Sequence, residues 1–145
     1  MKEIIKHYKT LLTCDQFVIT GSYALSLMGL VEPNKVGDLD LLLVNPTDET
    51  KNILERLQKE SPAKTSPSGG SVQFIFMHDR TKVDVFFDTK KIDSDLFCDG
   101  VQVNIVSNII SAKRKANRMK DWIQLRRIAG KFFNQSEFTA FLDKQ

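Results

Sequence analysis

The sequence predicts an α/β domain in which a mixed central sheet is flanked by helices and followed by C-terminal helices. Three observations indicate this fold class. Short apolar segments alternate with helical ones over residues 2–57, residues 72–87 have the pattern of a strand pair, and helical spacing runs through the last third. A chain of 145 residues has room for one domain. We therefore expect a single domain over 1–145 with about five strands, a central part over 17–87 and a helical part over 107–145.

The first predicted elements follow from changes in the spacing of apolar residues along the chain. Apolar residues at helical spacing predict a helix over 2–13. The β-branched segment 17–20, bounded by Gly21, predicts a strand. From Ser22 the apolar spacing is that of a helix, and Ser22 is expected to be its N-cap.

The middle of the chain is predicted to contain a central strand, a helix and a hairpin. The nearly continuous apolar run from Leu39 to Val44 is typical of a strand covered on both faces. Thr47 is expected to cap the helix that follows. The apolar segments 72–77 and 82–87, joined by four polar residues, predict a hairpin.

The last third is predicted to be mostly helical after a short strand around 101–103. Residues rich in Pro, Ser and Gly predict a loop over 61–70. Apolar residues three or four apart predict helix from 107 through Phe132 and Phe133, which would close the core or contact a second copy in a homodimer. A last helix is expected around 138–142.

The composition argues against a membrane-spanning protein. No apolar run approaches the roughly 18 residues that cross a bilayer, and the N-terminal segment is charged and amphipathic, unlike a signal peptide. Cys14 and Cys98 lack the spacing of metal ligands, so we expect buried free thiols in a reducing compartment. A cytoplasmic protein with no membrane partner is the natural expectation.

The net charge of +3 hides an asymmetry. Residues 113–131 contain eight basic side chains against Asp121 alone, so this window carries +7 and the remainder carries −4. A basic helical region beside an acidic remainder can face nucleotide phosphates or RNA. A solvated helix face would show the same pattern, so charge alone does not decide between them.

Two carboxylates share one face of the predicted central strand. Asp38 and Asp40 are two residues apart, and alternate side chains of a strand point the same way. Ionised carboxylates at that spacing repel unless one is protonated or a cation lies between them. Mg²⁺ prefers one or two carboxylates with phosphate oxygens and water. Solvated aspartates at the start of a strand are the alternative.

Asp84 interrupts an apolar strand in which an unpaired carboxylate would be costly. A salt bridge to a lysine or arginine would compensate it, and so would a metal shared with Asp38 and Asp40 if the two strands are neighbours. Three carboxylates there could hold two Mg²⁺ ions, roughly 3.5–4 Å apart, for in-line phosphoryl chemistry. Asp84 could then act as general base for an attacking hydroxyl.

Gly21 and Ser22 supply a complementary feature, a strand-to-helix turn of the kind that binds phosphates. Glycine permits close approach of the backbone, and the first turn of a helix presents N–H groups that lack partners. The Ser22 hydroxyl can add a hydrogen bond to a β- or γ-phosphate. An ordinary turn with a serine cap is the alternative. The chain has no P-loop motif.

Taken in order, Thr20-Gly21-Ser22, Asp38-Leu39-Asp40-Leu41 and Asp84 resemble the signature of the nucleotidyltransferase superfamily that includes DNA polymerase β-like enzymes. The residues after Gly21-Ser22 and the later Lys120-Asp121-Trp122 are most similar to a bacterial branch. That branch contains minimal nucleotidyltransferases and AbiEii-type toxins of toxin–antitoxin systems. The spacer before Asp38 is a little longer than usual. In those relatives a lysine and an aspartate from C-terminal helices join the site, and the resemblance carries these roles to Lys113 and Asp121.

The resemblance implies a nucleotidyltransferase-like fold, with 17–87 as its catalytic core. The implied activity is Mg²⁺-dependent transfer of a nucleoside monophosphate from a nucleoside triphosphate, ATP among them, to a hydroxyl acceptor on RNA or tRNA, a small molecule or a protein. One rival is a catalytically inactive, antitoxin-like regulator with this fold. The other is an RNA-binding module that uses the basic C-terminal helices. Trp122 is expected in the core, with a base-stacking platform as the alternative, and the isolated His7 and His78 are expected to be structural.

Overall fold

The computed structural model describes residues 1–61 and 72–130 of the chain. The predicted loop over 61–70, apart from Ser61, lies outside the described residues. So do Phe132, Phe133 and the predicted last helix around 138–142. The expectations for those segments, and for one domain over 1–145, stay predictions.

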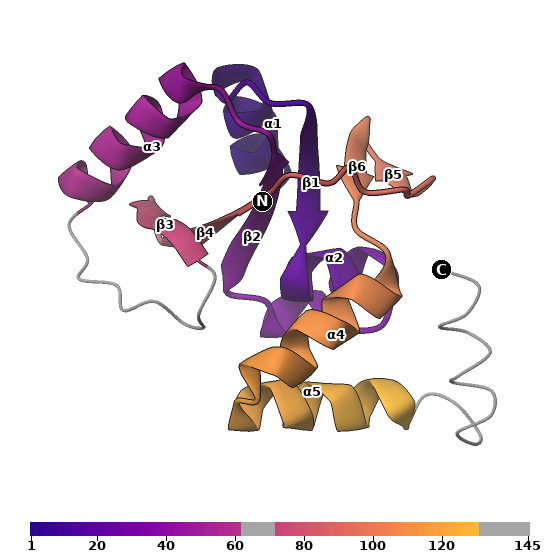
Figure 1. Cartoon of the computed structure of the whole chain (residues 1–145). Helices are drawn as coiled ribbons and strands as arrows, with labels where there is room; N and C mark the ends of the chain where they lie inside the picture. Colours follow the sequence, from indigo (N-terminus) through magenta and orange to yellow (C-terminus); the bar gives the residue numbers. More distant parts are fainter. Residues whose placement is uncertain (62–71, 131–145) are drawn as a thin grey trace.

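The order of elements confirms the predicted α/β fold class (Figure 1). The elements are α1 (Lys2–Leu11), β1 (Gln16–Thr20), α2 (Gly21–Leu27), the 3₁₀ helix η1 (Pro33–Lys35), β2 (Asp38–Val44), α3 (Asp48–Glu60), β3 (Val72–His78), β4 (Thr81–Asp88), β5 (Phe97–Cys98), β6 (Val101–Val103), α4 (Val106–Ala116) and α5 (Met119–Ala129).

Six strands of the described chain form one mixed sheet in the order β3-β4-β2-β1-β6-β5. β2 is parallel to β4 and antiparallel to β1, and β1 is parallel to β6. The two edge strands, β3 and β5, are antiparallel to their neighbours. The sheet has one strand more than predicted, because the two-residue β5 is too short to produce a sequence pattern.

The pairing of β2 with β4 decides where the acidic residues meet. Asp40 is registered with Asp84, and Asp38 is registered with Lys82. Leu39, which alternates with these aspartates, is completely buried on the opposite face, where the main hydrophobic core lies. The prediction that β2 is covered on both faces is therefore wrong for the face that carries the aspartates, because Asp38 and Asp40 are only half-buried.

The helix caps agree with the prediction at one end of the sheet and differ at the other. Thr47 caps α3, and its hydroxyl accepts a hydrogen bond from the Thr50 amide at 3.2 Å. Ser22 is not an N-cap, because α2 begins one residue earlier, at Gly21, with Thr20 as its cap. Ser22 lies in the first turn instead, and its hydroxyl is directed at the C-terminal helices.

The hairpin is confirmed with a tighter turn than predicted. His78 and Thr81 already pair across it, which leaves Asp79 and Arg80 as the turn. Asp79 adopts φ 54°, a left-handed conformation that aspartate tolerates better than most residues.

The C-terminal helical region breaks where the spacing had predicted continuous helix. Asn117 ends α4 in the left-handed conformation, with φ 52°, and its amide hydrogen-bonds to the Lys113 carbonyl. α4 and α5 lie together at the end of the sheet where β1 ends and β2 begins (Figure 1). The break lets α5 fold back and present a second row of side chains to that end.

No helix among the described residues is long and apolar enough to cross a membrane. Cys14 and Cys98 are free, as predicted, but they are half-buried.

Candidate active site

A cavity of about 840 Å³ opens between the sheet and the C-terminal helices. β2 and β4 supply the acidic side chains at its base, and α2, α4 and α5 together supply a wall beside them. The cleft is lined by six of the seven residues predicted for the site: Ser22, Asp38, Asp40, Asp84, Lys113 and Asp121. The fold therefore brings together residues that are up to 99 positions apart in sequence.

Gly21, the seventh predicted residue, contacts the site through its backbone. A Cβ atom at position 21 would overlap the carboxylate of Asp40, and Gly21 has φ +69°. The turn and the carboxylate can be this close only because residue 21 lacks a side chain. The close approach in this structure is to Asp40, and the predicted approach of the backbone to a phosphate stays a prediction.

The carboxylate of Asp40 is in an unfavourable position for a negative charge. Burial raises its pKa to about 7, and the neighbouring charge of Asp84 adds to the rise. The ammonium groups of Lys113 and Lys82 act in the opposite direction. Near neutral pH Asp40 is thus divided between its acid and its carboxylate.

Lys82, which the sequence analysis did not single out, lies between two of the predicted metal ligands. Its Nζ atom is 3.8 Å from Asp38 Oδ2 and 3.6 Å from Asp84 Oδ2. Asp84 is only 3% exposed, so a nearby cation offsets much of the cost of burying its charge. The sequence did contain a signal, because Lys82 precedes Asp84 by two residues and so shares its face of β4.

The donor set of Asp38, Asp40 and Asp84 suits a hard divalent cation, which binds carboxylate oxygens. Burial and the charge of Asp84 raise the pKa of Asp40, and a bound cation would favour its ionised form. As they stand, however, no three His, Cys, Asp or Glu side chains in 1–61 and 72–130 are close enough to hold an ion. The metal site stays a prediction, and Lys82 Nζ lies within 4 Å of two of its three carboxylates, Asp38 and Asp84.

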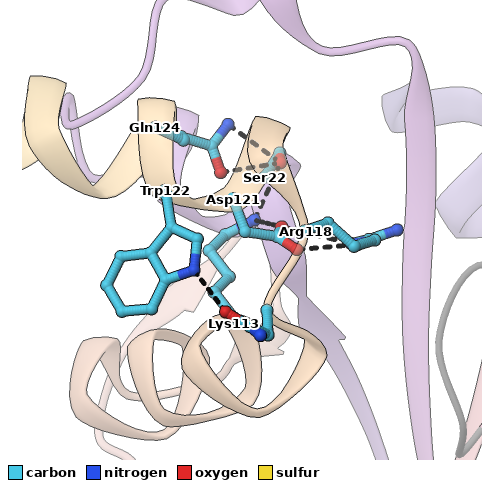
Figure 2. Close-up of polar contacts among 7 residues, drawn as sticks. Ser22, Lys113, Arg118, Asp121, Trp122 and Gln124 are labelled. Atoms are coloured by element: carbon cyan, nitrogen blue, oxygen red, sulfur yellow. Dashed lines mark hydrogen bonds and ion pairs between the residues drawn. The ribbon is translucent and has the colours of Figure 1, made fainter.

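The hydroxyl of Ser22 is the centre of a polar network that reaches α4 and α5 (Figure 2). Lys113 Nζ donates to Ser22 Oγ at 3.4 Å, and the Gln124 amide contacts the same oxygen at 3.1 Å from Nε2 and 3.2 Å from Oε1. Burial lowers the pKa of Lys113, against the opposing influence of Asp121 and Asp40. A cation and a hydroxyl are therefore held side by side on the wall facing the aspartates.

Asp121 lies next to Lys113 and forms ion pairs with two cations, Lys113 and Arg118 (Figure 2). It accepts hydrogen bonds from Arg118 Nε at 2.7 Å and Arg118 Nη2 at 3.1 Å, and Lys113 Nζ is 3.6 Å away. Burial alone would raise the pKa of Asp121, but the hydrogen bonds of Arg118 and the charge of Lys113 outweigh it and lower the pKa. These contacts suit a residue that positions Lys113.

Sequence reasoning missed several other residues of the cleft. Arg118, Lys120 and Arg127 line it, and they had been counted only as part of a basic window. Gln124 gave no signal, since a lone glutamine on a helix is ordinary. His7 and His78 do not line the cleft. Their rings lie 5.6 Å apart, and a hydrogen bond of 2.6 Å joins the Tyr8 hydroxyl and His78 Nδ1.

Comparison with known proteins identifies the fold. The chain is similar to the crystal structure of a "putative nucleotidyltransferase" from Thermotoga maritima, with a TM-score of 0.50 and 18% sequence identity. The similarity covers 90% of this chain and 91% of that one. At this identity the likeness shows a shared fold. No protein-family model and no curated protein sequence matches the chain.

Proposed function

We propose that this protein is a Mg²⁺-dependent nucleotidyltransferase that moves a nucleoside monophosphate from a nucleoside triphosphate to a hydroxyl acceptor. The observation that carries the proposal is the meeting of three carboxylates with a glycine-serine turn and a buried lysine in one cleft. The name of the Thermotoga maritima protein with the same fold supports the same chemistry. Placement in the AbiEii-type branch, or in a toxin–antitoxin system, would be a finer hypothesis that rests on the sequence resemblance alone.

Ser22 and Lys113 would bind the triphosphate. Their polar atoms are 3.4 Å apart on one wall of the cleft, so one phosphate oxygen can contact both. α2 has only seven residues, so the hydroxyl, the backbone amides of the turn and the Lys113 charge would contribute more than a helix dipole. Asp121 would act as a positioning residue, because it holds Lys113 and Arg118 in place.

Asp38, Asp40 and Asp84 would hold Mg²⁺ with oxygen donors. When bound, the ion supplies charge neutralisation at the phosphates and lowers the pKa of a coordinated hydroxyl. Asp84 would accept the proton of the acceptor hydroxyl. The hydroxyl oxygen forms a new bond to the α-phosphorus, the bond to the bridging oxygen breaks, and pyrophosphate leaves.

Calorimetric titration tests the site directly. Each of the four nucleoside triphosphates would be titrated, with and without Mg²⁺, into wild type, an Asp38→Asn/Asp40→Asn variant and an Asp93→Asn/Asp95→Asn control. The control removes two exposed carboxylates that do not line the cleft. We expect Mg²⁺-dependent binding in wild type and control that the first variant loses. Equal binding by all three proteins would show that the nucleotide lies elsewhere.

The position of Lys82 favours one alternative, a nucleotide-binding regulator with this fold and no transfer activity. An ammonium group between Asp38 and Asp84 occupies space that a metal ion would need. Triphosphate binding that is independent of Mg²⁺, without pyrophosphate release, would support this alternative.

A further inference from the structure

Four charged side chains occupy matching positions on the neighbouring strands β2 and β4. Asp38 is registered with Lys82, and Asp40 is registered with Asp84. Within each strand the two residues are two positions apart, so all four side chains project from the same face of the sheet. The group therefore contains a carboxylate at three positions and an ammonium at the fourth. With every member ionised its net charge is −2, which one divalent cation would neutralise.

The ammonium of Lys82 has a defined place between two of these carboxylates. Its Nζ atom is 3.8 Å from Asp38 Oδ2 and 3.6 Å from Asp84 Oδ2. The Lys82 side chain is 21% exposed and that of Asp84 is 4% exposed. Withdrawal of the lysine into solvent would remove a cation from a carboxylate that is almost completely buried, which is costly. The positive charge is thus part of the sheet, and it is present at any concentration of metal.

An ion shared by Asp38 and Asp84 would have to lie where this ammonium is. In sites with two divalent ions, the ions are roughly 3.5–4 Å apart and share carboxylates between them. Asp38 and Asp84 belong to different strands, so an ion that both of them bind would bridge β2 and β4, as Lys82 does. A metal ion and an ammonium group would repel each other there and compete for the same two oxygens.

The cavity side of the group keeps room for one ion. Asp38 and Asp40 line the cavity, whereas Lys82 does not, so the ammonium contacts its partners from beside the cavity. Mg²⁺ takes one or two carboxylates and completes its shell with phosphate oxygens and water. Within 1–61 and 72–130 no three acidic, His or Cys side chains are placed to hold an ion together. Two carboxylates completed by a triphosphate agree with this arrangement better than a shared cluster of three.

We propose that Lys82 replaces one of the two divalent ions in this cleft, so that the triphosphate binds with a single Mg²⁺ on Asp38 and Asp40. This inference rests on the proposed function, which assigns the triphosphate to the cleft. The ammonium would supply positive charge beside Asp84, where the proposed function puts the proton acceptor. A site with one ion and one lysine takes the place of the two-ion site that the sequence predicted.

The number of bound ions tests the inference without any turnover. Mn²⁺ would replace Mg²⁺, and electron paramagnetic resonance would measure free and bound Mn²⁺ during titration of the full chain with the α,β-methylene analogue of each nucleoside triphosphate. The analogue cannot be cleaved at that position, and a titration of the analogue alone gives the binding that needs no protein. We expect one Mn²⁺ for each complex, with the spectrum of an isolated ion. Two ions roughly 3.5–4 Å apart would instead give a magnetically coupled spectrum.

Two variants and a matched control assign the effect to Lys82. Lys82→Met should bind two Mn²⁺ for each complex and give the coupled spectrum, because the second position is then empty of charge. Lys82→Arg keeps a cation and should bind one ion. Lys90→Met removes an exposed lysine outside the cavity lining and should also bind one. Circular dichroism would confirm that each variant is folded, and the count in wild type decides the question even if Lys82→Met is not.

The outcomes separate this inference from the proposed function. Two coupled ions in wild type would overturn the replacement by Lys82 and leave the nucleotide site intact. A single ion in folded Lys82→Met would overturn it too, since the lysine would then not be what excludes the second ion. Binding of the analogues that is independent of Mn²⁺, or no binding at all, would overturn the proposed function and this inference together.

Discussion

The charge state of Asp40 leads to a quantitative prediction that needs no substrate. Its carboxylate is pressed against the backbone of Gly21 and paired in register with Asp84. Burial and that neighbour raise its pKa to about 7 from an ordinary value of 3.8. In an Asp40→Asn variant the side chain keeps nearly the same shape and remains polar, but it cannot ionise. The stability of this variant should therefore depend on pH differently from that of wild type.

The sign follows from proton binding in the two states. Between pH 3.8 and about 7 the folded protein keeps a proton on Asp40 that the unfolded chain releases. The stability contributed by the neutral acid is therefore present at low pH and is lost as pH rises through this window. The two pKa values correspond to a loss of up to about 4 kcal/mol in the free energy of unfolding above pH 7.

Urea unfolding in EDTA, at pH values from 4 to 8, would measure this difference. We expect Asp40→Asn to gain up to about 4 kcal/mol on wild type between pH 4 and pH 8. Asp93→Asn, which replaces an exposed carboxylate, should follow wild type at every pH. Parallel curves for wild type and Asp40→Asn would refute the reasoning, since they would mean that Asp40 titrates normally in the folded protein.

Three further predictions concern neighbouring residues. Gly21→Ala should lower the free energy of unfolding by about 1–3 kcal/mol in chemical denaturation, because residue 21 has positive φ and its Cβ would overlap the Asp40 carboxylate; wild-type stability would disprove that close contact. Lys82→Met should lower the melting temperature of the metal-free protein at pH 8, because Asp84 would lose a nearby cation. The stabilisation by Mg²⁺ should increase several-fold, since the ion would no longer compete with an ammonium group. A loss of Mg²⁺ stabilisation would indicate that Lys82 assists the metal instead. Asp121→Asn should cost about 3 kcal/mol at pH 7, because it removes the partner of Lys113 and Arg118. The lowered pKa of Asp121 means that this cost should shrink as pH falls below the ordinary Asp range, and a difference that persists at low pH would contradict the ion-pair explanation.

The parts of the fold and site that could be predicted are those fixed by local periodicity. Alternation along β2 put Asp38 and Asp40 on one face, and the apolar strand around Asp84 suggested a buried carboxylate that needed a counterion. Both are consequences of a two-residue repeat. The sequence predicted that these aspartates meet only if β2 and β4 are neighbours. Whether they are neighbours depends on contacts between distant segments, which no local pattern encodes.

The remainder depended on geometry that no short pattern encodes. Ser22 was expected to cap α2, but the N-cap is Thr20, and Gly21 with its positive φ forms the turn from β1 into the helix. The break at Asn117 was not predicted, since the apolar spacing continues through it. That single left-handed residue redirects α5 and exposes Trp122, which had been expected in the core.

The most direct measurement of the central claim is pyrophosphate release with incorporation of label. Wild type, Asp84→Asn and the Asp93→Asn control would be incubated with Mg²⁺, each α-labelled nucleoside triphosphate and a panel of hydroxyl acceptors that includes a mixed-sequence RNA. We expect wild type and the control to release one pyrophosphate for each labelled nucleotide that is incorporated. The rate of release should be about 10²- to 10⁴-fold lower in Asp84→Asn. Full turnover by Asp84→Asn, or no pyrophosphate from wild type with any triphosphate, would contradict it.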